Sequence, residues 1–575
     1  MNTMTEAKNL ESLTRRAGGK LRMGAAEAFV ETLAAHQVKD VFGLIGPPRL
    51  DALGLFSAAG IRLLSVAHGH GAAHMADGYG RAANQPAVCI APDGPGITNF
   101  VTAVATAYWA RTPLVMVSPE SGSVATGHAP IFAKITRWQT HVSSPLQVAD
   151  SLHRAFTIAL HERGPVQVGM SDDCFRGEGD YEIRAPLVIE RAAGGARSLA
   201  RAAHLLAEAK FPVIVSGEGV AIAGGVEDLK ALAEQLTAPV VSTFRHNDTF
   251  PASHPLACGP LGPHGSKAAM QAVARADVVL ALGTRLGDYG VPRDGESWRE
   301  DVKIIQVDGD DRALGVASEV ALAIHGDPRL AAQQLLAHFF KGRSARKPDK
   351  ARLAQVQRAK DAWAAELAAL PSPNRKGQIG ARRALAQLAK ALPRNAMVSV
   401  DVGNVCSVAS SYLNFEQSGS FFAAMAEGSR GCAYPTALGA KLARPDQPAI
   451  AYVGEGAWAL SLAEVMTAVK ERIPAIAVVF NNGQWGAGVE GHAGRSAVAP
   501  ANPDFSEVAR AMGAEGYRAE YEDEVADALK AALKSGKPSV VEIMVAPDRG
   551  EIFGREGARK ARRLPTRQRG TVLAE

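Results

Sequence analysis

Three histidines stand close together in SVAHGHGAAHMADGY, which covers residues 65–79. Histidine exchanges protons readily near neutral pH and is also a frequent metal ligand. His70 and His74 are four residues apart, so they share one face if a helix starts near Gly71, whereas His68 belongs to the end of the preceding strand. The segment therefore fits a proton-transfer site, a metal site or an inert scaffold, and these interpretations stay open.

A carboxylate and an amide follow two apolar runs in the last third of the chain. Glu455 comes after PAIAYVG (448–454) and Asn482 after PAIAVVF (474–480), a separation of 27 residues. One strand–helix–strand unit has this length, and parallel strands would bring both side chains to one edge of a sheet. Carboxylate and amide oxygens suit Mg²⁺, and glycine-flanked amides suit a diphosphate. Two ordinary strand-end turns are the alternative.

The elements that must position these residues are short apolar runs bounded by Gly, Pro or Asp. Segments of helical periodicity, such as 226–236 and 462–472, lie between them. This alternation predicts an α/β fold of doubly wound parallel sheets covered by helices on both faces. The runs that we expect to form strands are 87–92, 112–119, 212–217, 276–284, 303–309, 396–404, 448–456, 474–483 and 539–547.

Length and linker-like stretches predict three domains. A chain of 575 residues is too long for one hydrophobic core. Linker composition appears at 186–198, at the charged segment 341–353 and at 371–378. We therefore expect a flexible N-terminal segment at 1–20, domains at 21–185, 199–340 and 378–550, and a basic tail at 551–575.

The composition is that of an ordinary globular protein, with 47% hydrophobic and 21% charged residues. No apolar run approaches the roughly 20 residues that span a bilayer, and the charged N-terminus is unlike a secretory signal. Five widely spaced cysteines fit reduced thiols in the cytoplasm. Much of the net charge of +5 sits in the basic tail, which we interpret as a solvated end or a lid over an anion rather than a nucleic-acid contact.

The residues around Glu455 and Asn482 resemble the signature of thiamine-diphosphate-dependent enzymes of the acetolactate synthase superfamily, a Gly-Asp-Gly followed at the same distance by Asn-Asn. Within that superfamily, the chain is most similar to the sulfoacetaldehyde acetyltransferases. The matching blocks lie between residues 22 and 560 and include AAHMADGY (72–79), GPGITNFVTAVATAYWARTPLV (94–115), KFPVIVSGEGV (210–220), RHNDTFPASHPLACGPLG (245–262), ALSLAEVMTAV (459–469) and QWGA (484–487).

This resemblance implies a pyrimidine-binding domain, a central Rossmann-like domain and a diphosphate-binding domain. It also implies that thiamine diphosphate and Mg²⁺ lie between the first domain of one chain and the third of another, in a homodimer or homotetramer. Glu455, Asn482 and the carbonyl of Gln484 would hold Mg²⁺. The cofactor would be bordered at its pyrimidine by Gly94, Pro95, Gly96 and Asn99, and at its diphosphate by Asp401, Gly403, Asn404, Gly454, Gly456 and Ala457.

The central domain offers further strand-end residues. Gly217-Glu218-Gly219, Gly283-Thr284-Arg285 and Asp308 occupy positions that FAD-binding relatives use for the dinucleotide. A single Gly-x-Gly is weak evidence, because structural turns have the same pattern. Sulfoacetaldehyde acetyltransferases do not use FAD, so we expect thiamine diphosphate and Mg²⁺ alone, with FAD as the alternative.

Position 69 departs from the pattern of the family. Relatives carry a glutamate at the position of Gly69, and that glutamate exchanges a proton with the pyrimidine ring of the cofactor. General acid–base help of this kind contributes roughly 10² to 10⁴ in rate, and glycine cannot provide it. His68 and His70 are the candidate substitutes, whereas His74 matches a family position without a ligand role.

Arg430 and Glu455 are two further departures. Relatives carry a bulky apolar residue or cysteine at the position of Arg430, beneath the thiazolium ring. A guanidinium about 4 Å from that cation would cost about 4 kcal/mol at an effective dielectric of about 20, so Arg430 should face an anion or Glu427, or the cofactor sits differently. Glu455 replaces an aspartate, and its extra methylene moves the carboxylate by roughly 1.5 Å, so the loop must shift to keep Mg²⁺–oxygen distances of about 2.0 to 2.1 Å.

The resemblance implies a lyase or transferase that converts sulfoacetaldehyde and phosphate to acetyl phosphate and sulfite. Arg245, His246 and Asn247 lie in a shared block and Arg555 in the basic C-terminal segment, and such donors suit a sulfonate or phosphate; His246 joins His68 and His70 as a catalytic candidate. One alternative is a carboligase or decarboxylase acting on a 2-oxo substrate, since glyoxylate carboligase also lacks the glutamate. The other is a non-catalytic member that binds another anion.

Overall fold

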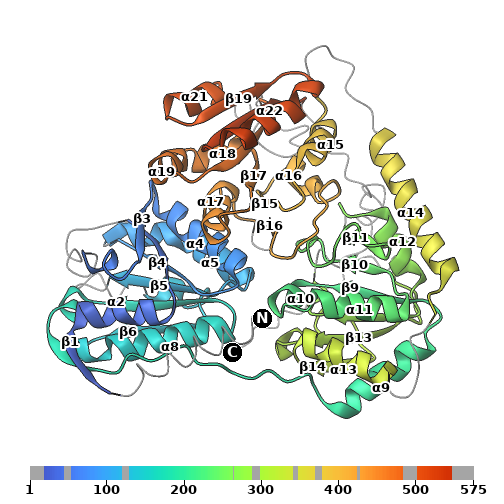
Figure 1. The fold of residues 1–575 in the computed structure, drawn as a ribbon, viewed down its shortest axis with the longest axis horizontal. Coiled ribbons are helices and arrows are strands. Elements are labelled where there is room, and N and C mark those ends of the chain that lie inside the picture. Colours follow the sequence, from blue (N-terminus) through green and yellow to red (C-terminus); the bar gives the residue numbers. More distant parts are fainter. Residues whose placement is uncertain are drawn as a thin grey trace, which may run out of the picture.

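The structure, a computed structural model, describes residues 19–44, 54–92, 94–119, 129–262, 264–287, 298–340, 347–369, 379–423, 428–483 and 502–546. Almost all of the expected N-terminal segment and the whole basic tail lie outside these ranges, as do Gln484, Glu427 and Arg555. The described residues form three α/β units, with the third at the top of Figure 1, the first at the lower left and the central unit at the lower right.

Each unit is built on one six-stranded sheet in which every pair of neighbouring strands is parallel, which confirms the predicted fold class. Every apolar run that was expected to form a strand contains one. In spatial order, the first sheet contains β3 (Arg62–Ser65), β2 (Asp40–Gly43), β4 (Ala87–Ile90), β5 (Leu114–Pro119), β7 (Pro165–Met170) and β6 (Trp138–Val142). The second contains β11 (Ala257–Pro260), β10 (Val240–Ser242), β9 (Pro212–Ser216), β12 (Val278–Leu282), β13 (Lys303–Asp308) and β14 (Leu322–His325). The third contains β16 (Phe421–Ala423), β15 (Met397–Val400), β17 (Ala449–Gly454), β18 (Ala475–Asn481), β20 (Ser539–Met544) and β19 (Glu515–Ala519).

Helices cover the sheets, and their apolar faces supply the core residues that pack on the strands. The first unit has α2 (Ala25–Ala35), α4 (Gly69–Ala83), α5 (Val101–Trp109), α7 (Ala129–Phe132) and α8 (Val148–His161). The central unit has α9 (Ala196–Glu208), α10 (Glu218–Ile222), α11 (Val226–Leu236), α12 (Lys267–Arg275) and α13 (Pro328–Phe340), followed by α14 (Lys350–Ala369). The third unit has α15 (Ala381–Ala391), α16 (Asn404–Ala409), α17 (Ala433–Ala443), α18 (Glu455–Ser461), α19 (Glu464–Glu471), α21 (Phe505–Ala511) and α22 (Glu522–Ser535).

An antiparallel ribbon that the periodicity did not predict joins the two ends of the first unit. It pairs β1 (Leu21–Gly24) with β8 (Glu178–Tyr181). Each of these strands has only four residues, and neither is a continuous apolar run. Short edge strands of this kind carry almost no sequence signal.

The strand order of each sheet reverses at an interior point, and ligands in open α/β sheets bind beyond the carboxyl ends of the strands at such a reversal. In the first sheet the reversal lies between β2 and β4, in the second between β9 and β12, and in the third between β15 and β17. These three places are where the chemistry of the fold is expected.

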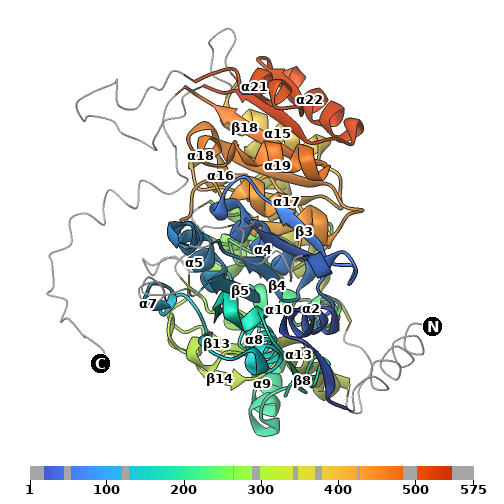
Figure 2. The same cartoon turned by 90° about the vertical axis from the view of Figure 1, so that its left-hand side faces the viewer.

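The first and third units share one hydrophobic core. Helix α4 packs along α17, and buried residues of both units form a single cluster around them. The two backbones approach so closely that a side chain at Gly439 would collide with the carbonyl of Met75, and one at Gly78 with the carbonyl of Thr436. Figure 2 shows α4 and α17 next to each other at this junction, whereas the central unit has its own clusters on both faces of its sheet.

Candidate functional site

The structure brings Glu455 and Asn482 to neighbouring strand ends of the third sheet. Strands β17 and β18 pair in register with Gly454 opposite Phe480, so both side chains follow directly at the same edge. Glu455 is buried, with 4% of its surface exposed, and it begins α18; Gly456 and Ala457 follow in the same turn. Gln484, the third residue expected at the metal, lies outside the described residues.

Asn481, the neighbour of Asn482, is fixed by buried polar contacts that sequence reasoning missed. Its amide donates to Glu542 Oε1 at 2.7 Å, and its Oδ1 accepts from the Gly483 N–H at 3.1 Å and from Asn502 Nδ2 at 3.1 Å. Glu542 lies on β20 and is fully buried, and this burial raises the pKa of its carboxyl. Successive residues of an extended chain point to opposite sides, so these contacts set the direction of Asn482.

Asp401, which was expected to line a diphosphate, accepts hydrogen bonds from backbone N–H groups. Oδ1 accepts from the N–H of Val402 at 2.8 Å and of Gly431 at 3.1 Å, and Oδ2 accepts from the N–H of Ala433 at 3.0 Å. The side chain is fully buried, and burial raises its pKa to about 6. Asp401 therefore holds the segment before α17 against the end of β15.

Arg430 stands in the segment that Asp401 holds. Its neighbour Ser429 is buried, with its hydroxyl 3.3 Å from His74 Nε2, and Gly431 packs against Leu460 of α18 with a φ of +75°. Arg430 itself is exposed. The backbone on both sides is thus fixed, while the guanidinium reaches solvent at the switch point of the third sheet.

Two glycines leave room at this switch point. A Cβ added to Gly403, at the end of β15, or to Gly454, at the end of β17, would meet no atom within 4 Å. Asn404 follows Gly403 as the first residue of α16. Backbone N–H groups beside open space, next to a buried carboxylate and an amide, are a donor set that fits a diphosphate with Mg²⁺.

The histidine segment forms the expected turn from β3 into α4, but the helix starts at Gly69 rather than near Gly71. His68 caps the helix, with its Nδ1 accepting from the His70 N–H at 3.2 Å. The rings of His70 and His74 lie 4.4 Å apart, which agrees with a shared helix face. Burial lowers the pKa of His70 to about 4 and lowers that of His74 as well, so both rings are uncharged at neutral pH.

No metal-binding group of three or more His, Cys, Asp or Glu side chains occurs in the described part of the chain. The metal interpretation of the three histidines therefore gains no support. All five cysteines are buried and unpaired, as reduced thiols require. Among the described helices, none has the length and apolarity needed to cross a membrane.

Gly69 lies against the residues that were expected to border a pyrimidine ring. Gly94, Pro95, Gly96 and Asn99 all belong to the 3₁₀ segment Gly94–Phe100. A Cβ added at Gly69 would lie 3.1 Å from Asn99 Cβ and 2.7 Å from Cε2 of Phe100. The turn that contains Gly69 and the segment that contains Gly94 to Asn99 are therefore in contact, and the Phe100 ring fills the space beside Gly69.

Glu464 is a second buried carboxylate that sequence reasoning missed. It lies on α19 of the third unit, yet it accepts hydrogen bonds from the turn of the first unit, at 3.0 Å from the His68 N–H and 3.3 Å from the Ala67 N–H. Thr467 Oγ1 donates to it at 2.6 Å. Burial raises the pKa of Glu464. Its carboxylate occupies the space that a Cβ at Gly71 would need, so a larger residue at this position would displace Glu464.

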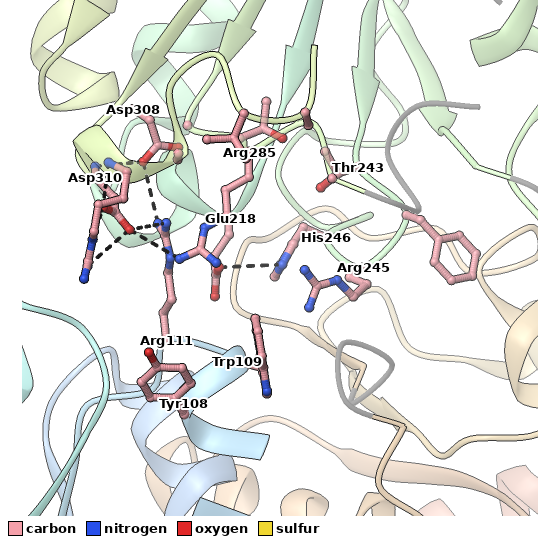
Figure 3. A pocket seen from close by; sticks show the side chains of 18 of the residues that line it. Tyr108, Trp109, Arg111, Glu218, Thr243, Arg245, His246, Arg285, Asp308 and Asp310 are labelled. Atoms are coloured by element: carbon pink, nitrogen blue, oxygen red, sulfur yellow. Dashed lines mark hydrogen bonds and ion pairs between the residues drawn. The ribbon is translucent and has the colours of Figure 1, made fainter. Parts of the chain in front are cut away.

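A cavity of about 610 Å³ lies at the switch point of the second sheet. Figure 3 shows side chains of the central unit converging on it from above and Tyr108, Trp109 and Arg111 of the first unit from below. Glu218, Thr284, Arg285 and Asp308, which were named as dinucleotide positions, all line it.

His246 and Arg245 also line this cavity. His246 Nε2 is 3.9 Å from Glu218 Oε2, but burial lowers the pKa of His246 to about 4, so this contact is not an ion pair at neutral pH. Burial alone would raise the pKa of Glu218, yet His246, Arg111, Arg245 and Arg163 together bring it below its ordinary value. Asn247 is already engaged, since its amide donates to the carbonyls of Ser410 at 3.2 Å and Leu413 at 2.7 Å.

Three parts of the chain match family models of thiamine pyrophosphate enzymes. Residues 23–141 match the N-terminal TPP binding domain, 199–335 the central domain and 401–543 the C-terminal TPP binding domain. The central match covers its whole sheet, whereas the other two cover most of theirs and leave out β7 and β15.

Individual proteins extend this similarity over nearly the whole chain. Sulfoacetaldehyde acetyltransferase of Castellaniella defragrans is 44% identical, over 95% of this chain and 97% of the relative. The enzyme of that name from Alcaligenes xylosoxydans xylosoxydans is 43% identical over the same shares. A probable acetolactate synthase large subunit of Methanocaldococcus jannaschii is 30% identical over 91% of this chain and 92% of its own length. A putative thiamin diphosphate-dependent enzyme from Mycobacterium smegmatis has the same fold, with a TM-score of 0.77 at 23% identity over 92% of this chain and 100% of that chain.

Proposed function

Because the chain belongs to the thiamine pyrophosphate enzyme family, we propose that it is an acyltransferase that converts sulfoacetaldehyde and phosphate to acetyl phosphate and sulfite. The observation that carries this proposal is the identity of 43 to 44% with proteins named sulfoacetaldehyde acetyltransferase over 95% of the chain. The reaction breaks the carbon–sulfur bond of the aldehyde and joins its two-carbon unit to an oxygen of phosphate.

Thiamine diphosphate, when bound, supplies a nucleophilic carbon and an electron sink for this chemistry. We assign Mg²⁺ to Glu455, Asn482 and the Gln484 carbonyl. The diphosphate lies along Gly403, Asn404, Gly454, Gly456 and Ala457, while Asp401 acts by holding the segment of Arg430. The pyrimidine lies against Gly94–Asn99 of a second chain, so the working assembly is at least a homodimer.

The proton that relatives move with a glutamate needs another carrier, since Gly69 has no side chain. We assign this task to His68, because it is exposed at the turn and only its Nδ1 is used by the helix cap. His70 is a weaker candidate, because burial lowers its pKa to about 4 and leaves it unprotonated at neutral pH.

We assign recognition of the sulfonate to Arg430. Its guanidinium is exposed at the switch point between β15 and β17, on a backbone that Asp401 fixes. A planar guanidinium makes paired, charge-assisted hydrogen bonds to a sulfonate. The negative charge of the bound sulfonate would then offset the repulsion between the guanidinium and the thiazolium cation.

The decisive experiment measures both products. Purified protein with thiamine diphosphate, Mg²⁺ and phosphate is given sulfoacetaldehyde, and sulfite release is followed together with acetyl phosphate formation. We expect both products in equal amounts. If sulfite forms without acetyl phosphate, the enzyme uses an acceptor other than phosphate. If neither product forms at saturating cofactor, the proposal is rejected.

Arg430→Met should raise the KM for sulfoacetaldehyde, whereas replacing the exposed Arg275 of α12 by Met should not.

A carboligase acting on a 2-oxo acid is the second candidate. The ring of Phe100 beside Gly69 favours it, because that apolar contact marks a site rebuilt without the usual carboxylate. Incubation with pyruvate, followed by detection of acetolactate, separates the two functions.

FAD, the alternative cofactor, would lie in the cavity of the central unit. The visible absorption spectrum of the purified protein tests this alternative, because bound flavin absorbs there.

A further inference from the structure

The cavity of the central unit is separate from the switch point at which we place the diphosphate and Mg²⁺. We propose that it binds a protonated tetrahedral anion of the phosphate class, either inorganic phosphate or the phosphoryl group of a larger ligand, and that it discriminates against sulfate. The cavity lies at the reversal of strand order between β9 and β12, where open α/β sheets bind ligands.

The lining of the cavity carries an excess of positive charge. It contains five arginines, which are Arg111, Arg137, Arg245, Arg285 and Arg312. Only three carboxylates, those of Glu218, Asp308 and Asp310, oppose them. Among the described lining residues, arginines thus outnumber carboxylates by two, an excess of positive charge that suits a dianion such as hydrogen phosphate.

Three of these arginines converge on one carboxylate. Asp310 is 2.8 Å from Arg312 Nε, 2.9 Å from Arg111 Nη2 and 3.4 Å from Arg285 Nη2. Figure 3 shows Arg111 reaching up from the first unit to Asp310 and Asp308. Asp308 Oδ1 adds a second carboxylate, 3.6 Å from Arg111 Nη1, so the three guanidinium groups exceed the negative charge of the two carboxylates by one, and like charges this close repel. A bound anion at the cluster would supply the missing negative charge.

Asp308 makes the site selective. The residue is 2% exposed, and its Oδ2 has no hydrogen-bond donor among the described residues. Its Oδ1 accepts from the Asp310 N–H at 2.9 Å. A buried carboxylate oxygen without a donor costs free energy, so it favours a ligand that brings one. Hydrogen phosphate carries an O–H group beside its anionic oxygens, whereas sulfate and sulfonates at neutral pH carry none.

This selectivity deepens the proposed function, on which its biological meaning rests. The proposed reaction uses a sulfonate and consumes phosphate, so a site that prefers hydrogen phosphate to an unprotonated sulfonate distinguishes the acceptor from the substrate anion. Arg111 comes from the first unit and Arg285 from the central unit, so a ligand held by both would also join the two units.

Calorimetric titration of the full chain in a Tris buffer, without substrate, tests the site. Inorganic phosphate, adenosine monophosphate and sulfate are titrated in separate runs. We expect saturable binding of phosphate, with sulfate at least about tenfold weaker. Tight binding of the nucleotide with weak binding of phosphate would identify the larger source of the same phosphoryl group. Equal binding of sulfate and phosphate, or binding of none of the three, would overturn the proposal.

Two variants and a control assign the effect to the cavity. Asp308→Asn replaces the orphan acceptor by an amide of the same shape, and we expect the preference for phosphate over sulfate to vanish. Arg285→Gln, on the more exposed rim, should weaken binding of both anions. Asp301→Asn, which alters an exposed ion pair with Arg299 in the same unit, should change neither. Unchanged selectivity in a folded Asp308→Asn protein would contradict the role of Asp308. Because binding is measured without turnover, this result is independent of whether sulfite release is observed.

Discussion

The ring of Phe100 occupies the space beside Gly69 into which any other residue at that position would extend. A Cβ at position 69 would lie 2.7 Å from Cε2 of the ring, closer than carbon atoms approach without displacement. Phe100 is fully buried, so its ring can move only if its surroundings repack. The lack of a carboxylate at position 69 and the position of the Phe100 ring therefore depend on each other.

We expect Gly69→Glu alone to destabilise the protein by about 1 to 3 kcal/mol, the usual cost of overpacking. Combining it with Phe100→Ala should make the two effects less than additive, because the removed ring makes room for the carboxylate. Thermal unfolding of the two single variants and the double variant gives this coupling. Proton exchange at the reactive carbon of bound thiamine diphosphate, followed by NMR, should rise only in the double variant. A rise in the single variant at unchanged stability would show that Phe100 does not block the position.

Glu464→Ala should loosen the turn that carries His68. Removing the carboxylate takes the acceptor from the His68 N–H, whereas the Ala67 N–H keeps Thr467 Oγ1 at 3.0 Å, so we expect a loss of about 1 kcal/mol or more. The affinity for thiamine diphosphate should fall with it, as measured by titration of the folded protein. Glu471 lies at the other end of α19 and pairs with the neighbouring Lys470 at 3.5 Å, so Glu471→Ala serves as the matched control. Equal effects of the two variants would argue that Glu464 contributes helix stability alone.

The elements that the sequence predicted well are those with a continuous apolar run. Strand β18 (Ala475–Asn481) is buried on both faces of a parallel sheet, so every residue is selected for apolarity and the run is easily recognised. Strand β16 (Phe421–Ala423) has only three residues, too few for a pattern to emerge.

The site was predictable only where its residues follow strands that the sequence reveals. Glu455 and Asn482 each come directly after such a run, so the parallel register brought them together. Glu464 meets the His68 N–H across 396 residues of sequence, and Arg111 meets Asp310 across 199. Such contacts arise from the packing of whole units against each other, which no local periodicity encodes.

Asn481→Ala should weaken Mg²⁺ binding without touching the metal. The substitution releases the contacts to Glu542 and Asn502 that fix the chain beside Asn482. Loss of a residue that orients a metal ligand typically costs about 10-fold to 100-fold in affinity. Titration of Mn²⁺ by electron paramagnetic resonance, in the presence of thiamine diphosphate, measures this. Asn502→Ala removes only one of the contacts and should have a smaller effect. If Asn481→Ala binds Mn²⁺ as tightly as the wild type, Asn481 does not orient a metal ligand.

Acid should destabilise the first unit through two histidines in contact, His36 directly after α2 and His153 on α8. His36 Nε2 lies 3.2 Å from His153 Nδ1, and the His36 ring stacks on Phe156. Burial, and to a lesser degree His153, lowers the pKa of His36 to about 4, and burial followed by Arg184 lowers that of His153. The unfolded chain therefore binds more protons than the folded one below the ordinary histidine pKa of about 6.5.

It follows that the stability of this pair is fully present above the unfolded pKa of about 6.5 and is lost as the pH falls from there towards 4. Urea unfolding at pH 7.5 and at pH 5 should show this loss in the wild type. His36→Leu, which keeps the apolar contact with Phe156 but cannot be protonated, should reduce the difference between the two pH values. The exposed His204, replaced by Leu, should leave it unchanged. A His36→Leu protein with the full pH dependence of the wild type would place the acid sensitivity at the other buried histidines, His70, His74 and His246.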